Sequence, residues 1–179
     1  MSGAITALRA AGISGSPSPV SKSRVLVECA LGQLAARGAE TALVDLATLP
    51  AEALLGRGAD RLVSDALETV TAARVVVVGT PVYRATYSGL LKVFFDLLAQ
   101  DGLVGKIGIP IVTGHGSAHS LAVDHGLRPL FARLGATVVP SGVYATSELF
   151  AGGQPASELL EAVDRAVREA IALANATIN

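Results

Sequence analysis

The sequence predicts a three-layer α/β protein in which helices cover both faces of a five-stranded parallel sheet with the strand order 2-1-3-4-5. Short apolar segments typical of β-strands alternate along the chain with amphipathic segments, the pattern of helical crossovers between parallel strands. Residues 74–79 read Arg-Val-Val-Val-Val-Gly, as in a central strand buried on both faces. A length of 179 residues suits one domain, 1–179, with a full core.

The first half of the chain contributes two strands and two helices before this central strand. Residues 8–14 form the first strand, which has the weakest pattern of the five, and a Ser/Pro-rich loop follows it. Helix 23–37 ends before Gly38, a residue typical of helix C-caps. Strand 41–46 comes next, and residues 60–72 place apolar side chains at helical spacing.

The second half repeats the alternation after the central strand. We expect helix 88–99, strand 107–112 and helix 117–134 in that order. The fifth strand covers 137–139 and resumes through Val143, and helix 156–174 closes the chain. The crossovers between these parallel strands should be right-handed.

Composition and charge narrow the classes of partner. Charged residues make up only 16% of the chain, which favours burial of further surface in a homo-oligomer. The formal net charge is −1 and no run of Lys or Arg is present, which argues against nucleic-acid binding.

A single cysteine, Cys29, excludes an intramolecular disulfide and favours the cytoplasm. No apolar run approaches the roughly 20 residues that cross a bilayer, so we expect neither secretion nor membrane insertion.

In an open parallel sheet, ligands bind beyond the carboxyl ends of the strands where the strand order reverses. The informative loops are therefore 14–23, 79–89 and 113–119. The first is rich in serine and leads into a helix, whose free N–H groups and serine hydroxyls suit a phosphate. The alternative is that these serines only turn the chain and cap the helix. The loop has neither the glycines of a Walker motif nor G-x-G-x-x-G.

The other two loops suit a flat ring. Residues 80–89 combine aromatic and small residues with one cation, a mixture that can wall a ring and present backbone edges to its polar atoms. The alternative is a turn with one buried tyrosine. Residues 113–116 offer backbone N–H groups at a helix start, suited to negative charge on a reduced ring.

These motifs together resemble those of a known family. Gly15-Ser16-Pro17 with Ser21 and Ser23, followed by residues 80–92 (TPVYRATYSGLLK), strongly resembles the NAD(P)H-dependent FMN reductases, which have a flavodoxin-like fold. Residues 118–129 are similar to the members that supply reduced flavin to alkanesulfonate monooxygenases. The resemblance extends from about Leu8 to Ala145.

The resemblance implies FMN and NADPH, or NADH, as ligands. It implies hydride transfer without a catalytic protein nucleophile, positioned by Tyr83, Arg84 and His115. Arg84 or Arg128 would attract the nicotinamide cofactor's phosphates. It also implies a homodimer or homotetramer and a flavin-dependent monooxygenase partner of the sulfonate or sulfur assimilation type. The implied binding residues are Ser16, Ser18, Ser21 and Ser23 at the phosphate, Pro81, Val82, Tyr83 and Arg84 at the isoalloxazine ring, and Thr113, Gly114, His115 and Gly116 at a third loop.

The chain departs from the family pattern in places. Ser18 stands where the family often has Arg, which removes a phosphate cation unless Lys22 or Arg24 substitutes. His115 stands where many relatives have Gly. His125 matches a Tyr that forms a π-type bulge at a subunit interface near the flavin; the alternative is an ordinary polar residue on a solvated helix.

The sequence also leaves alternative functions to consider. A quinone or azo-dye reductase with prosthetic FMN is the main alternative, and a flavodoxin-type electron carrier fits less well because the chain is not strongly acidic. A redox-inactive binding module of the same fold is a third alternative. We expect no metal site, because His115 and His119 lack a third ligand.

Overall fold

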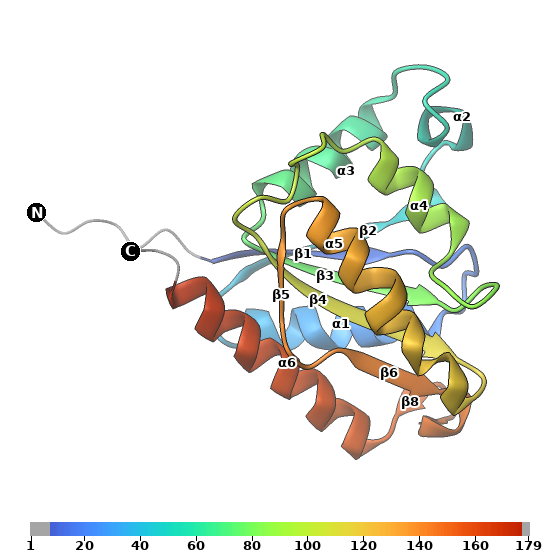
Figure 1. Ribbon diagram of the computed structural model, residues 1–179, viewed down its shortest axis with the longest axis vertical. Coiled ribbons are helices and arrows are strands. Elements are labelled where there is room, and N and C mark those ends of the chain that lie inside the picture. The colour runs from blue at the N-terminus through green and yellow to red at the C-terminus, as the bar shows by residue number, and fades with distance from the viewer. Residues whose placement is uncertain (1–7, 177–179) are drawn as a thin grey trace, which may run out of the picture.

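A parallel β-sheet forms the centre of the computed structural model, which describes residues 8–176 (Figure 1). The strands hydrogen-bond in the order β2-β1-β3-β4-β5, and β6 also pairs with β4, always in parallel. The predicted flavodoxin-like order is confirmed. The strands are β1 (Arg9–Ser14), β2 (Glu40–Asp45), β3 (Val75–Pro81), β4 (Ile107–Gly114), β5 (Thr137–Val138) and β6 (Val143–Thr146).

Helices cover both faces of this sheet, α1 and α6 on one and α3, α4 and α5 on the other (Figure 1). Val77 and Val78 of β3 are both fully buried and belong to different hydrophobic clusters, as alternation along a strand requires. The central strand is therefore covered on both faces as predicted. The helices are α1 (Lys22–Ala35), α2 (Ala51–Leu54), α3 (Arg61–Ala72), α4 (Gly89–Asp96), α5 (Arg128–Arg133) and α6 (Ser157–Ala176).

Close packing of α1 on the sheet depends on Gly79 at the carboxyl end of β3. A Cβ at Gly79 would lie 2.4 Å from Val27 Cγ2 and 2.8 Å from the Ser23 carbonyl oxygen, both in α1. Such distances are too short for real atoms, so only glycine allows this approach. The glycine thereby brings the first turn of α1 onto the edge of the sheet where the strand order reverses.

Strand register brings the three informative loops to that edge. Ser14 of β1 pairs with Gly79 of β3, and the Gly15 N–H donates a 2.8 Å hydrogen bond to the Gly79 carbonyl. On the other side of β3, the Val82 N–H donates a 2.8 Å bond to the Thr113 carbonyl at the end of β4. The loops after β1, β3 and β4 therefore leave the sheet side by side.

The predicted helix 117–134 is wrong, because the segment is not one continuous α-helix. It consists of a 3₁₀-helix (Ser117–Ser120), a π-helix (Val123–Leu127) and α5. Pro129 contributes to the break, since it has no N–H to donate to the carbonyl four residues earlier and its ring crowds that carbonyl.

Two other expectations need adjustment, and some short elements were not predicted. The fifth strand is split, because β5 and β6 pair with opposite ends of β4. Helix α4 ends at Asp96 rather than Ala99. The short hairpin of β7 (Phe150–Ala151) and β8 (Gln154–Pro155) was not predicted, although Gly152 and Gly153 with φ angles of 57° and 82° form the kind of turn that joins such strands. A 3₁₀-helix (Leu46–Thr48) and α2 were also missed.

Candidate functional site

The loop after β1 presents hydroxyl groups and free N–H groups at the start of α1. Ser21 caps the helix, its hydroxyl accepting a 3.2 Å hydrogen bond from the Arg24 N–H. Ser16 Oγ accepts a 3.2 Å bond from the Ser18 N–H. Within residues 8–176, the backbone N–H groups of Lys22 and Ser23 have no hydrogen-bond acceptor. These donors lie at the positive end of the helix dipole, so the loop is suited to bind an anion.

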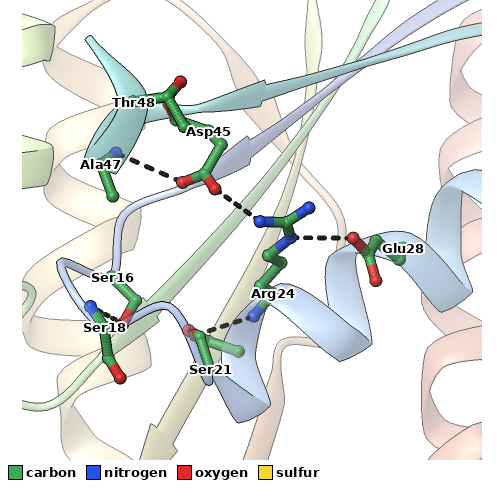
Figure 2. A network of polar contacts seen from close by, with 9 residues as sticks. Ser16, Ser18, Ser21, Arg24, Glu28, Asp45, Ala47 and Thr48 are labelled. Carbon is green, nitrogen blue, oxygen red and sulfur yellow. Dashed lines mark hydrogen bonds and ion pairs between the residues drawn. The ribbon is translucent and has the colours of Figure 1, made fainter.

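Arg24 is drawn away from this loop by two carboxylates. Figure 2 shows its side chain reaching toward Asp45 at the end of β2 and Glu28 on the next helical turn. The guanidinium donates at 2.6 Å to Asp45 and at 2.8 Å to Glu28. The hydrogen bond to Glu28 and the charge of Asp45 raise the pKa of Arg24 above its usual value. The Arg24 guanidinium is thus paired with two carboxylates and lies away from the serine loop in this structure.

Lys22 provides a positive charge beside the serines instead. Its side chain lines the same cavity as Ser16, Ser18 and Ser21. The ammonium lies 5.6 Å from the ring centroid of Phe150, within the range of a cation–π interaction. The β7–β8 hairpin, which contains Phe150, therefore helps to hold Lys22 at the cavity.

The loop after β3 carries a tight two-residue turn. Tyr83 and Thr86 hydrogen-bond through their backbones in both directions, at 2.9 Å from the Tyr83 N–H and 3.3 Å from the Thr86 N–H. The two residues between them, Arg84 and Ala85, have φ angles of 52° and 70°. Left-handed conformations are unfavourable for residues with a Cβ, so this turn stores backbone strain. Strain of this kind is found at ligand-binding loops.

Buried polar contacts fix the base of this turn. The Ser88 hydroxyl donates to the Gly15 carbonyl of the serine loop and accepts a 3.1 Å bond from the Leu91 N–H. The Ser88 N–H donates at 3.0 Å to Thr80 Oγ1. Ser88 is 1% exposed, so it joins the first two loops in a region shielded from water.

The loop after β4 is supported from behind by Tyr144 of β6. The Tyr144 hydroxyl donates a 2.5 Å hydrogen bond to the Gly116 carbonyl. Burial of this hydroxyl raises the pKa of Tyr144 above its usual value, so the neutral donor form is favoured. A Cβ at Gly114 would lie 2.4 Å from the same hydroxyl oxygen, so the glycine leaves room for the Tyr144 hydroxyl in its present position.

The three loops enclose a cavity of about 320 Å³. Nine predicted binding residues line it: Ser16, Ser18, Ser21, Pro81, Val82, Tyr83, Thr113, Gly114 and His115. Three further residues, Val20, Lys22 and Ser147, complete the lining. Ser147 was missed because the predicted fifth strand ended at Val143, whereas β6 continues to Thr146 and ends directly before this serine.

Three predicted residues do not line the cavity. Ser23 is fully buried, and its hydroxyl lies 3.0 Å from that of Ser21, so it supports the helix cap. Gly116 faces Tyr144 through its carbonyl. Arg84 is exposed at the tip of the strained turn.

The structure places His125 and Arg128 away from this cavity lining. His125 lies within the π-helix and is exposed. Arg128 donates at 2.7 Å to Asp124 and at 2.8 Å to the Val139 carbonyl, so it ties the π-helix to the segment between β5 and β6. In this structure the Arg128 guanidinium is thus bound to Asp124 and to backbone carbonyls, and its predicted role toward a cofactor phosphate stays a prediction.

The cavity fits a ligand with a phosphate at one end and a flat ring at the other. Hydroxyl groups, helix N–H groups and the Lys22 ammonium gather at the serine loop, whereas Pro81, Val82 and Tyr83 provide an apolar wall. The buried Ser14 hydroxyl, at the end of β1, has no hydrogen-bond partner within residues 8–176 and leaves a polar group unsatisfied at this edge. The same residue range contains no group of three or more metal-ligating side chains and no helix long and apolar enough to cross a membrane.

The fold and this cavity define a flavodoxin-like protein with a site for a phosphorylated ring. A family model described as NADPH-dependent FMN reductase matches residues 8–150. The chain belongs to this family of oxidoreductases, which use FMN and a reduced nicotinamide.

Individual relatives agree with this assignment. An FMN reductase (NADPH) of Pseudomonas putida is 36% identical over 162 residues, covering 89% of this chain and 82% of the relative. An NADH-dependent FMN reductase of Pseudomonas fluorescens is 36% identical over 166 residues, covering 90% and 89%. The crystal structure of an apo NADH:FMN oxidoreductase superimposes with a TM-score of 0.85 at 31% identity, covering 94% of this chain and 89% of that one.

Proposed function

We propose that this reductase binds FMN as an exchangeable substrate and releases the reduced flavin to a separate flavin-dependent monooxygenase of the sulfonate or sulfur assimilation type. The carrying observation is that Tyr83, at the wall of the cavity, is 46% exposed. A ring packed against a half-exposed wall is not sealed from solvent, so the flavin can leave after reduction. The resemblance of residues 118–129 to the sulfonate-linked reductases supports the same partner.

The residues would divide the work of binding between the two ends of the flavin. Ser16, Ser18, Ser21 and Lys22 would hold the phosphate. Pro81, Val82 and Tyr83 would support the ring, with Ser147 facing them from the loop after β6. The bound flavin supplies the hydride acceptor, and the protein's contribution is alignment of two rings.

The loop after β4 would stabilise the negative charge of the reduced flavin rather than define the shape of the cavity. Thr113, Gly114 and His115 would place backbone N–H groups near the ring, where donors favour the added negative charge. The exposed Arg84 would attract the phosphates of the nicotinamide cofactor, since Arg128 is engaged elsewhere.

Cofactor preference, assembly and location are further parts of the proposal. One relative is named for NADPH and another for NADH, so both cofactors should be compared.

A homodimer or homotetramer with His125 at a contact between copies fits the exposure of that residue on the π-helix. The need for reduced nicotinamide supports a cytoplasmic location.

The test is to follow NADPH and NADH oxidation while the concentration of added FMN is varied. We expect the rate to saturate with FMN, and gel filtration of the mixture to separate free FMN from the protein. A yellow protein that keeps its FMN through gel filtration and reduces quinones at a rate independent of added FMN would instead be a prosthetic-flavin reductase. Absence of nicotinamide oxidation would contradict both.

A further inference from the structure

Gly126 of the π-helix faces the strained turn of the cavity wall. Gly126 is buried, and a Cβ built on it would lie 2.8 Å from Thr86 Oγ1 and 3.3 Å from Tyr87 Cδ1. Both neighbours are stiff, because threonine is β-branched and Tyr87 packs against the hydrophobic core. A side chain at position 126 would therefore have to push against the Thr86 side chain and, through it, against the turn.

The tip of this turn has few other restraints. Val82 is tied to β4 and Ser88 to Thr80, whereas the backbone hydrogen bonds of Tyr83 and Thr86 within the described residues join these two residues only to each other. Thr86 is thus the residue through which a push from the π-helix would reach Tyr83. Because Arg84 and Ala85 already hold left-handed conformations, the turn has little freedom to absorb a displacement.

From these contacts we propose that Gly126 is a positioning residue for flavin binding. Because Gly126 has no side chain, the π-helix can pack closely against the Tyr83–Thr86 turn. This close packing holds the turn in a position that leaves room for the isoalloxazine ring of FMN. The π-helix, which contributes no residue to the cavity lining, would in this way set the width of the ring site. The inference rests on the proposed function, since it concerns the same flavin.

The test is to titrate the protein with FMN and follow quenching of flavin fluorescence. We expect Gly126→Ala to weaken FMN binding about three- to ten-fold, because a displacement of a few tenths of an ångström at the wall misplaces the ring. The double variant Gly126→Ala/Thr86→Ala removes the hydroxyl group that the new Cβ would meet, and it should recover most of the lost affinity. A purely structural role would change the melting temperature and leave the affinity of the folded protein unaltered.

Gly32→Ala is the matched control. Gly32 also lies in a helix, α1, but a Cβ there would meet no atom within 4 Å. This variant should raise the melting temperature and keep the FMN affinity within about two-fold of the wild type. It separates the general effect of replacing a helical glycine from the contact with Thr86.

Two results would overturn the inference: wild-type affinity in Gly126→Ala, or a loss that Thr86→Ala does not repair. If Gly126→Ala does not fold, Thr86→Leu enlarges the same contact from the turn, and unchanged affinity in that variant would also overturn it. Failure of the wild-type protein to bind FMN would refute the proposed function instead, so the two failures are distinguishable.

Discussion

The Asp45 carboxylate at the end of β2 lies 2.6 Å from the Arg24 guanidinium in the first turn of α1. Asp45 is mostly buried, with 16% of its side chain exposed, and its second oxygen accepts a 3.2 Å hydrogen bond from the Ala47 N–H. The pair holds Arg24 against the edge of the sheet and away from the serine loop (Figure 2). This geometry supports the proposal that Lys22 is the cation for the phosphate.

Replacing Lys22 should therefore affect FMN and riboflavin differently. We expect Lys22→Gln to weaken FMN binding about five- to ten-fold by removing one charge-assisted contact to the phosphate. Riboflavin, which has no phosphate, should bind with unchanged affinity. Fluorescence titrations with the two flavins measure this ratio.

Arg24→Gln is the control for that experiment, because it removes a cation two residues away. It should leave the ratio of FMN to riboflavin affinities unaltered while lowering stability by about 1 kcal/mol through loss of a partly exposed ion pair. Equal weakening of both flavins by Lys22→Gln would show that Lys22 does not contact the phosphate.

Ser88→Ala should destabilise the protein although it removes only one oxygen atom. The Gly15 carbonyl and the Leu91 N–H would both lose their partner in a buried region, at a cost of about 2 kcal/mol. Urea unfolding gives this free energy. Ser64→Ala, at an exposed helical site, should stay within about 0.5 kcal/mol of the wild type, and a similar small effect at Ser88 would contradict the bridge between the two loops.

Ala85→Gly should relieve strain in the turn. At a φ of 70° a glycine avoids the Cβ penalty, and the gain exceeds the extra entropy of the unfolded chain. We expect the free energy of unfolding to rise by about 0.5 kcal/mol. The same substitution at exposed Ala172 in α6 should lower it by about 1 kcal/mol, so a decrease at both positions would argue against strain at Ala85.

Cys29 should react slowly with thiol reagents. Burial, with the nearby charge of Glu28, raises the pKa of its thiol, so less thiolate is present at a given pH than in a free cysteine. Labelling with a chromogenic disulfide at pH 8 should be slower in the folded than in the urea-unfolded protein, and should accelerate as pH rises. Cys29→Ala should retain nicotinamide oxidation; a large loss of turnover would assign the thiol a role that the cavity does not suggest.

The fold was predictable because its signals are local. The run of valines in β3 and the helical spacing in α3 are properties of short segments, and the general rules for parallel sheets then give the strand order. Periodicity alone predicted one continuous helix after β4, because apolar spacing continues through the π-helix while Pro129 interrupts its hydrogen bonds. The π-type bulge at His125 was expected only from the resemblance.

The site was predictable as a set of loops and less so as a set of side chains. The resemblance to the FMN reductases, carried by the loops after β1, β3 and β4, implied nine of the lining residues. Sequence motifs could not separate Lys22 from Arg24, since both lie in the first turn of the same helix. Only the position of Asp45, 21 residues from Arg24 in sequence, distinguishes them.

The sequence by itself determined the alternation of strands and helices, the order of the strands and the loops that meet at the sheet edge. The tertiary structure alone decided which charges are neutralised, that Ser147 joins the cavity and that Gly126 contacts Thr86. The physical reason is range: periodicity and turn chemistry act over a few neighbouring residues, whereas ion pairing and steric contact depend on segments that only folding brings together.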